Sequence, residues 1–250
     1  MPPSSIKSFA IAFAALLAPA GGVAQAPPVT EKSITRDGFA FPTDGPVRIL
    51  IFRPDIKVGE QTTAGLFQPN AEWHENARKE LTAALLAAKK SRQFDAVLQD
   101  EPAAGKAGQY AEYRALFRVI VSTAIRHKLF GNDPLPSKAN RFDWSLGSGI
   151  AQVAAGSNAD YGLFLFSHDG FESSGRKAAQ LVASLMGARD TPGAHLGYAA
   201  LVDLKTGDLL WLNVDLKASG DVRTAEGAAA RIEQLLAGFP ARGPSAGTTP

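Results

Sequence analysis

Apolar residues occur in short β-rich runs in some parts of the chain and at helical spacing in others. This difference separates the predicted strands from the predicted helices. The short β-rich run 47–52 ends before Pro54 and predicts a strand. Further β-rich runs predict strands at about 94–98, 162–166, 196–204 and 209–216. Apolar residues at helical spacing predict helices at about 70–90, 110–130, 143–156 and 224–236, and another that starts at Ser173 or Ser174. The unbroken run 162–166 is typical of a strand covered on both faces, so we expect it at the centre of a sheet.

Turn and capping residues divide these elements. Lys205–Asp208 connects the last two strands as a hairpin, with Gly207 at the position that needs a positive φ. Asn70 and Asp143 are each followed by a helical pattern and are predicted to cap those helices. Residues 55–69 have no clear period and predict a loop or a short extra strand.

The alternation of strands and helices predicts one α/β domain of three layers, with a mixed sheet, helices on both faces and a C-terminal β-hairpin followed by a helix. We place this domain at residues 46–238. Residues 27–45 are rich in Pro, Gly and Thr and predict a flexible lead-in, and residues 239–250 predict a disordered tail.

The first 26 residues have the pattern of a secretory signal peptide. Lys7 precedes an apolar run at 9–17, and small residues precede a cleavage site after Ala26. A membrane anchor is the alternative, but the run is about half of the ~20 residues that span a bilayer. We therefore expect a periplasmic protein, although full secretion also fits, and no later segment has the length of a membrane span.

Composition excludes several classes of function. The 26 basic and 24 acidic residues are too balanced for a protein that binds a nucleic-acid backbone. The chain has no cysteine, so it has no disulfide, thiolate metal site, cysteine nucleophile or lipidated cysteine. Its four histidines are scattered, and no glycine-rich nucleotide motif occurs, so we expect no metal and no cofactor.

A candidate ligand site lies at 167–177, where a central strand is expected to end before a helix. His168, Asp169, Ser174 and Arg176 are its candidate ligand-binding residues. A helix N-terminus with a nearby arginine would suit a carboxylate or phosphate. Arg53 and Asp55 follow the strand 47–52 and would join the site if the two strands are neighbours.

Two other interpretations of this segment remain open. It is also typical of a capped helix with a solvated basic first turn, which is the more common arrangement. A catalytic triad of Ser174, His168 and Asp169 is conceivable, but the Gly-x-Ser-x-Gly signature of many serine hydrolases is missing. We therefore do not expect an enzyme.

Three segments carry a resemblance to a known group of proteins: 142–147, 159–164 and 201–213, the last followed by Gly220-Asp221 and an Ala-rich helix. Through them, residues 46–237 resemble bacterial periplasmic proteins with the fold of the curli-secretion protein CsgG and the amino-terminal domain of TolB. The resemblance implies an assembly or interaction domain. Two departures are the missing lipoprotein cysteine and the lack of pore-forming amphipathic hairpins, which argue against a secretion pore.

These observations predict a non-catalytic, soluble accessory protein of the cell envelope. Its partner would be another envelope protein or a cell-wall component, and it would be peripheral to a membrane at most. The partner would meet the exposed hairpin edge, the termini or the cleft. The alternative is a small-molecule or anion-binding protein, or more weakly a hydrolase, that uses 167–177. The sequence specifies neither the partner, nor the process, nor the oligomeric state.

Overall fold

A computed structural model describes residues 31–62, 64–92, 94–102, 104–129, 135–138, 141–173 and 195–242. The expected signal peptide 1–26, most of the helix that would follow Ser173 or Ser174, and most of the expected C-terminal tail lie outside these residues.

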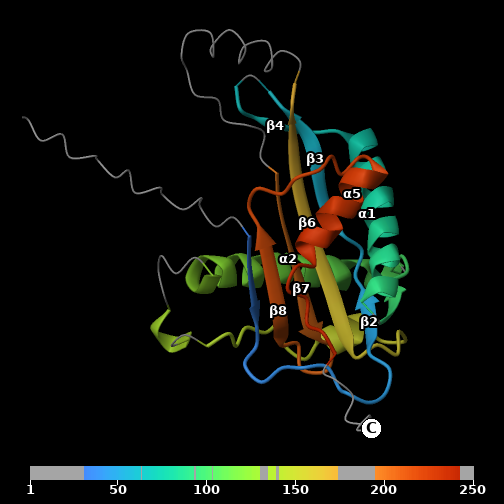
Figure 1. Cartoon of the computed structure of the whole chain (residues 1–250), viewed down its shortest axis with the longest axis vertical. Coiled ribbons are helices and arrows are strands. Elements are labelled where there is room, and N and C mark those ends of the chain that lie inside the picture. Colours follow the sequence, from blue (N-terminus) through green and yellow to red (C-terminus); the bar gives the residue numbers. More distant parts are fainter. Residues whose placement is uncertain are drawn as a thin grey trace, which may run out of the picture.

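The described chain forms a mixed eight-stranded sheet (Figure 1). Its main path runs β1-β8-β7-β6-β2-β5, while β3 pairs with β6 and β4 pairs with β3. On this path β2 runs parallel to β5 and β6, whereas β7, β8 and β1 are antiparallel to their neighbours. Off the path, β3 is parallel to β6 and antiparallel to β4. The strands are β1 (Glu31–Thr35), β2 (Arg48–Ile51), β3 (Asp55–Gln61), β4 (Phe67–Pro69), β5 (Asp95–Leu98), β6 (Tyr161–Glu172), β7 (His195–Asp203) and β8 (Leu209–Asp215).

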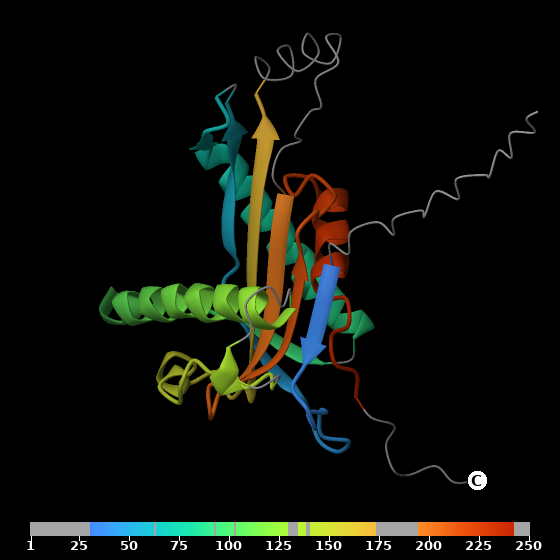
Figure 2. The ribbon, with the colours of Figure 1, turned by 90° about the vertical axis from the view of Figure 1, so that its left-hand side faces the viewer.

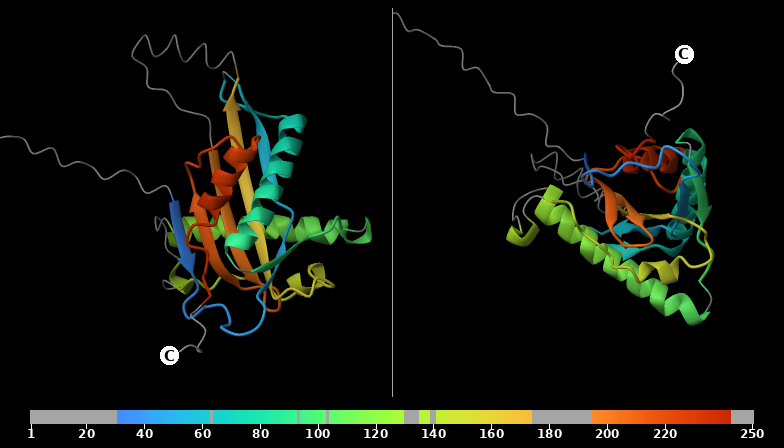
Figure 3. Two further views of the ribbon diagram at one scale, coloured as in Figure 1. Left: turned by 45° about the vertical axis from the view of Figure 1, so that its right-hand side comes forward. Right: turned by 90° about the horizontal axis from the view of Figure 1, so that it is seen from below.

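Helices cover both faces of the sheet, which confirms the three-layer prediction (Figures 2 and 3). One apolar cluster joins α1 and α5 to one face, and a second joins α2 and α3 to the other. The helices are α1 (Ala71–Ser91), α2 (Ala107–Ala124), α3 (Ile150–Val153) and α5 (Ala225–Leu235), with short turns at Ala104–Lys106, Ile125–Leu129 and Pro136–Lys138. We call the two faces the α1 side and the α2 side.

Several local predictions are confirmed. The Asn70 side chain accepts a hydrogen bond from the Trp73 amide at 3.0 Å and caps α1. Gly207 has a φ of 81° in the hairpin turn. A Cβ there would lie 2.2 Å from the Gly147 carbonyl oxygen, so glycine is needed for space as well as for conformation. The run 162–166 is buried in β6, between β7 and β2.

The predicted lead-in and tail are shorter than expected. Residues 31–35 form β1, which pairs antiparallel with β8 through a register from Glu31 and Asp215 to Thr35 and Trp211. The backbone pairing, rather than an apolar pattern, orders this strand. At the other end Phe239 is buried against Phe41 and Trp211, so the packed domain extends past residue 238.

Residues 55–69, predicted as a loop or a short extra strand, form the antiparallel pair β3 and β4. The next segment differs from expectation. The helix predicted from Asp143 to about 156 is only the single turn α3, and Asp143 pairs with Lys138 at 3.1 Å instead of capping it. Phe142, Trp144 and Leu146 are all buried, a spacing of two that is typical of extended chain, and this segment hydrogen-bonds to the hairpin turn.

Strand β3 decides where a ligand could enter. In open α/β sheets ligands bind beyond the carboxyl ends of the strands. Here the chain leaves β2, passes Arg53 and Pro54, and continues as β3 along β6, from Asp55 beside Phe166 to Gln61 beside Glu172. The space beyond β2, where the sequence places its cleft, is therefore occupied by another strand.

Candidate functional site

The predicted ligand segment 167–177 is part of strand β6 as far as Glu172, so its side chains alternate between the two faces. Leu163 and Leu165 belong to the α1-side cluster, which places Asp169 on that side. Phe164 and Phe166 belong to the α2-side cluster, which places His168 there. The structure therefore separates these two candidate residues. Ser174 and Arg176 lie outside the described residues.

Asp169 is the centre of a closed network on the α1 side. Arg231 of α5 forms a bidentate pair with it, at 2.8 and 3.1 Å, and both side chains are 0% exposed. The Ser167 hydroxyl lies 2.6 Å from the carboxylate and accepts a hydrogen bond from Arg231 at 2.7 Å. His195 of β7 adds its Nδ1 at 2.9 Å. Each carboxylate oxygen is thus used within the fold.

This network favours an ionised carboxylate without favouring catalysis. Burial by itself would raise the pKa of Asp169, but the hydrogen bonds from His195 and Arg231 outweigh it and lower the pKa. In the described part of the chain, the Ser167 hydroxyl contacts Asp169 and Arg231 and no histidine. A serine nucleophile needs a base to take its proton, and the carboxylate beside this serine is a weak base because Arg231 and His195 already bond to it. The arrangement is that of a buried ion-pair network.

Arg231 is the member of this network that the sequence interpretation missed. It lies three residues after Ala228 and four before Leu235, on the apolar stripe of its helix. A charged residue on such a stripe requires a buried partner of opposite charge. The place of Arg231 on the apolar stripe could therefore have predicted a buried acid on the sheet.

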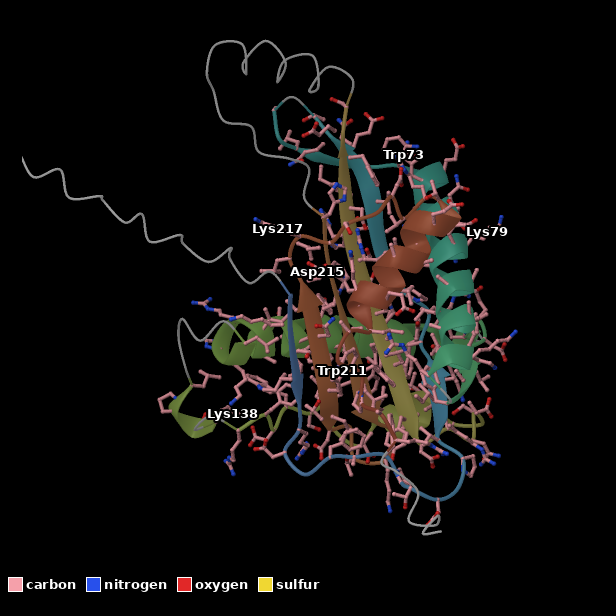
Figure 4. The ribbon with its side chains drawn as sticks, in the orientation of Figure 1. Trp73, Lys79, Lys138, Trp211, Asp215 and Lys217 are labelled. Carbon is pink, nitrogen blue, oxygen red and sulfur yellow. The ribbon has the colours of Figure 1, made fainter. Side chains whose placement is uncertain are left out.

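A surface cluster closes the network on its outer side. The Arg223 guanidinium stacks between Trp73 and Phe171, 4.3 and 3.8 Å from their ring centres, and pairs with both carboxylate oxygens of Asp221. The hydrogen bond from Arg223 lowers the pKa of Asp221. Phe171 in turn lies edge-on to His195. Figure 4 shows Trp73 at the end of α1 that faces α5, where this cluster forms.

Asp55 and His168 are fixed on the α2 side. Asp55 forms an ion pair with Arg114 of α2 and lies 3.4 Å from Arg118, so its carboxylate holds the helix to the sheet. His168 packs on the Phe67 ring at 4.7 Å, and burial lowers the pKa of its imidazole. The interaction partners of both residues belong to the fold, and neither residue joins Arg53.

Arg53 lies at a different site, where two grooves meet at the end of β5. It pairs with Glu101 and lines a groove of about 530 Å³ under α1, together with Arg78, Lys79 and Leu86. A second groove, of about 320 Å³, opens on the α2 side and is lined by Val97, Tyr110 and Val153 among others. We call these the α1 groove and the α2 groove. They share four residues: Leu98, Gln99, Asp100 and Glu101.

The strand between these grooves is the outer strand of the sheet on this side. In the parallel pair with β2, alternate residues of β5 bond inward, as the amides of Asp95 and Gln99 do. The N–H and C=O groups of Ala96 and Leu98 therefore point outward. Lys89 donates to the Ala96 carbonyl at 3.3 Å, whereas no described residue hydrogen-bonds to the backbone of Leu98.

The strand order corrects the prediction of which strand has an exposed edge. The sequence interpretation places an exposed edge on the C-terminal hairpin. In the structure β7 lies between β6 and β8, and β1 covers the other side of β8. The hairpin therefore offers no free edge, and β5 does.

The described residues contain neither a metal-binding cluster nor a membrane-spanning helix. Among the described residues no group of three or more His, Asp or Glu side chains is placed to hold a metal ion. No helix in the described ranges is long and apolar enough to cross a membrane.

No protein-family model matches the chain, and no curated protein matches it. Among solved structures, a PelC dodecamer from Paraburkholderia phytofirmans is similar, with a TM-score of 0.38 and 11% identity over 86% of this chain and 99% of that one. A single-substitution variant of the PelC dodecamer gives 0.37 and 10%, over 85% and 99%. Similarity at this level supports no inference about function or assembly.

Proposed function

We propose that this protein is a non-catalytic accessory protein of the bacterial cell envelope that binds a segment of another envelope protein at the edge of β5. The observation that carries the proposal is the outward-facing backbone of Leu98, which lies between two grooves. An exposed strand edge recruits an extended segment through main-chain hydrogen bonds, and pockets beside it accept alternate side chains.

The buried networks support binding rather than catalysis. Three of the candidate residues, Asp169, Asp55 and Arg53, form ion pairs with Arg231, Arg114 and Glu101, so their charges are used within the fold. The expected signal peptide and the resemblance to CsgG-like and TolB-like envelope domains support a periplasmic location. In the alternative, an anion site at 167–177, His168 and Asp169 would not act together, because they lie on opposite faces of the sheet.

Site-specific photo-crosslinking in cells tests this proposal. A photoreactive residue replaces Val97, which is 51% exposed beside the edge, or Val119, which is 61% exposed on the outer face of α2 and serves as the matched control. We expect a discrete crosslinked protein from position 97 and none from position 119. The same products from both positions, or none from 97, would overturn the proposal. Crosslinks from 97 to cell-wall glycan instead of protein would also overturn it.

A further inference from the structure

The chemistry of the β5 edge points to the class of segment that it binds, and this inference rests on the proposed function. Asp95 and Val97 are two residues apart, so they project from the same side of the strand, and both are exposed. Asp100 follows at the carboxyl end of the strand and is exposed as well. The edge thus presents an acid, an apolar side chain and a second acid in order.

The two acids are not neutralised within the fold. In the described part of the chain neither Asp95 nor Asp100 forms an ion pair. Arg48 is the register partner of Asp95 on β2 but makes no ion pair with it. Two other nearby cations are used elsewhere, since Arg53 pairs with Glu101 and Arg92 with Glu233. A bound strand that carried Lys or Arg opposite these positions would supply the missing counter-charges.

The two grooves lie on opposite faces of the sheet, so each would receive every second side chain of a bound strand. Successive residues of an added strand would point alternately into the α1 groove and the α2 groove. The α2 groove offers Leu50, Val97, Tyr110 and Val153 as apolar contacts. Directly opposite side chains on paired strands contact each other, and apolar β-branched or aromatic pairs and opposite charges are the favourable combinations.

We infer that β5 binds an extended segment in which Lys or Arg flanks apolar residues (Val, Ile or aromatic) that alternate with polar ones. The segment adds to the sheet as an outer strand and forms main-chain hydrogen bonds with Leu98. Lys89 covers the Ala96 carbonyl, so the main-chain hydrogen bonds form at Leu98, and the segment reaches Asp95 through its side chains alone.

A peptide-binding measurement tests the inference. The probe is the fluorescently labelled peptide acetyl-Lys-Thr-Val-Thr-Val-Thr-Lys-amide, and its binding to the full chain is followed by fluorescence anisotropy. One control peptide has Glu in place of both Lys, and another has the order Lys-Val-Val-Thr-Thr-Thr-Lys, which keeps the composition and breaks the alternation. We expect binding of the first peptide to be about tenfold tighter than that of either control, given two charge pairs and one apolar pair. Equal binding of all three would overturn the inference.

Variants of the protein locate the binding. The double substitution Asp95→Asn with Asp100→Asn should weaken binding of the cationic peptide about tenfold. The matched control Asp37→Asn with Asp44→Asn removes the same charge from exposed positions that line neither groove and should leave binding unchanged. Equal weakening by both pairs would indicate non-specific attraction to net charge, and the inference would be wrong.

Strand addition is tested at Leu98. Proline here removes the outward N–H and leaves the bonds to β2 intact, because the amides of Val97 and Gln99 make them. Leu98→Pro should abolish peptide binding, while Leu98→Ala, which also loses the side chain, should retain most of it. Equal binding by the two variants would exclude a main-chain contact. If position 97 captures a protein in cells but the peptides show no preference, this inference fails and the proposed function stands.

Discussion

Two regions of the molecule use charge in opposite ways. The Asp169 network on the α1 side contains four polar side chains, three of them 0% exposed, and each carboxylate oxygen has partners inside the fold. At the β5 edge, the exposed acids have no ion pair and the outward backbone groups of Leu98 no hydrogen bond to any residue that the structure describes. The polar groups of the first region are bonded to one another, whereas those of the second are exposed and can bond to a partner.

The comparison shows that a concentration of charged residues in sequence does not by itself identify a binding site. A buried charge needs a partner in the fold, because the cost of removing it from water must be offset. A surface backbone group can instead bond to water until a partner strand replaces that water. The following changes should separate the two regions by their effects on stability and on binding.

The largest effect is expected from Arg231→Met. It leaves Asp169 buried without its cation, and breaking a buried pair in this way costs about 3–5 kcal/mol. Urea unfolding measures the loss. The control Arg92→Met breaks the exposed pair with Glu233 and should cost about 1 kcal/mol or less. A loss as small as that of the control would show that the network is not a major source of stability.

A second substitution sharpens this result. Adding Asp169→Leu to Arg231→Met removes the unpaired charge and should recover part of the lost free energy of unfolding, because an apolar pair of similar volume is often tolerated. A double variant that is less stable than Arg231→Met alone would contradict this account.

Acidification should lower the free energy of unfolding in two steps. His168 has a lowered pKa in the folded protein, so the unfolded chain takes up its proton first, and stability begins to fall below about pH 6.5. Asp169 also has a lowered pKa. Its contribution is complete above about pH 3.9, the ordinary value, and is lost as the pH falls through the folded value. Urea unfolding at a series of pH values measures both steps.

The variant His168→Gln assigns the first step. It should remove the decline that begins near neutral pH and leave the acidic step in place. An unchanged profile would mean that another group causes the first decline.

The smallest effect on stability is expected from Lys89→Gln at the open edge. The change removes the ammonium group that covers the Ala96 carbonyl, and a surface substitution of this kind changes stability by about 0.5 kcal/mol or less. It should lengthen the available edge and strengthen binding of the cationic peptide by about threefold, as one hydrogen bond becomes available. Lys217→Gln is the matched control, since Lys217 is exposed beyond β8 and lines neither groove (Figure 4). Weaker binding after Lys89→Gln would argue against pairing at this edge.

Most of the layers were predictable because burial follows the spacing of apolar residues. The stripes of α1 and α5, the buried run of β6 and the hairpin at Gly207 all have this origin. Strand β1 has one apolar residue, Ile34, and depends on pairing with a distant strand, so its pattern carries little signal. The segment 142–146 was wrongly predicted as helix because Ile150 and Val153 extend its apolar positions at a mixed spacing.

The candidate site was harder to predict for a topological reason. Sequence indicates which residues follow a strand, but the order of strands in the sheet decides which edge is free. Arg53 lines a groove beside Glu101 and does not join the segment 167–177, although the sequence interpretation expected this for neighbouring strands. Among the described strands β5 pairs with β2 alone, whereas β1 covers the hairpin at β8, and neither arrangement has a local signature in the sequence.

The pairing of β1 with β8 also has a consequence for the order of folding. Glu31 lies beside Asp215, so the earliest described strand completes the sheet against the last one. During synthesis or export β1 emerges long before its partner and has no strand to pair with until β8 has formed. Contacts between residues so distant in sequence slow the search for the native state. The closing of this edge is therefore expected to be a late event, and until then the chain exposes the hairpin edge that the finished domain covers.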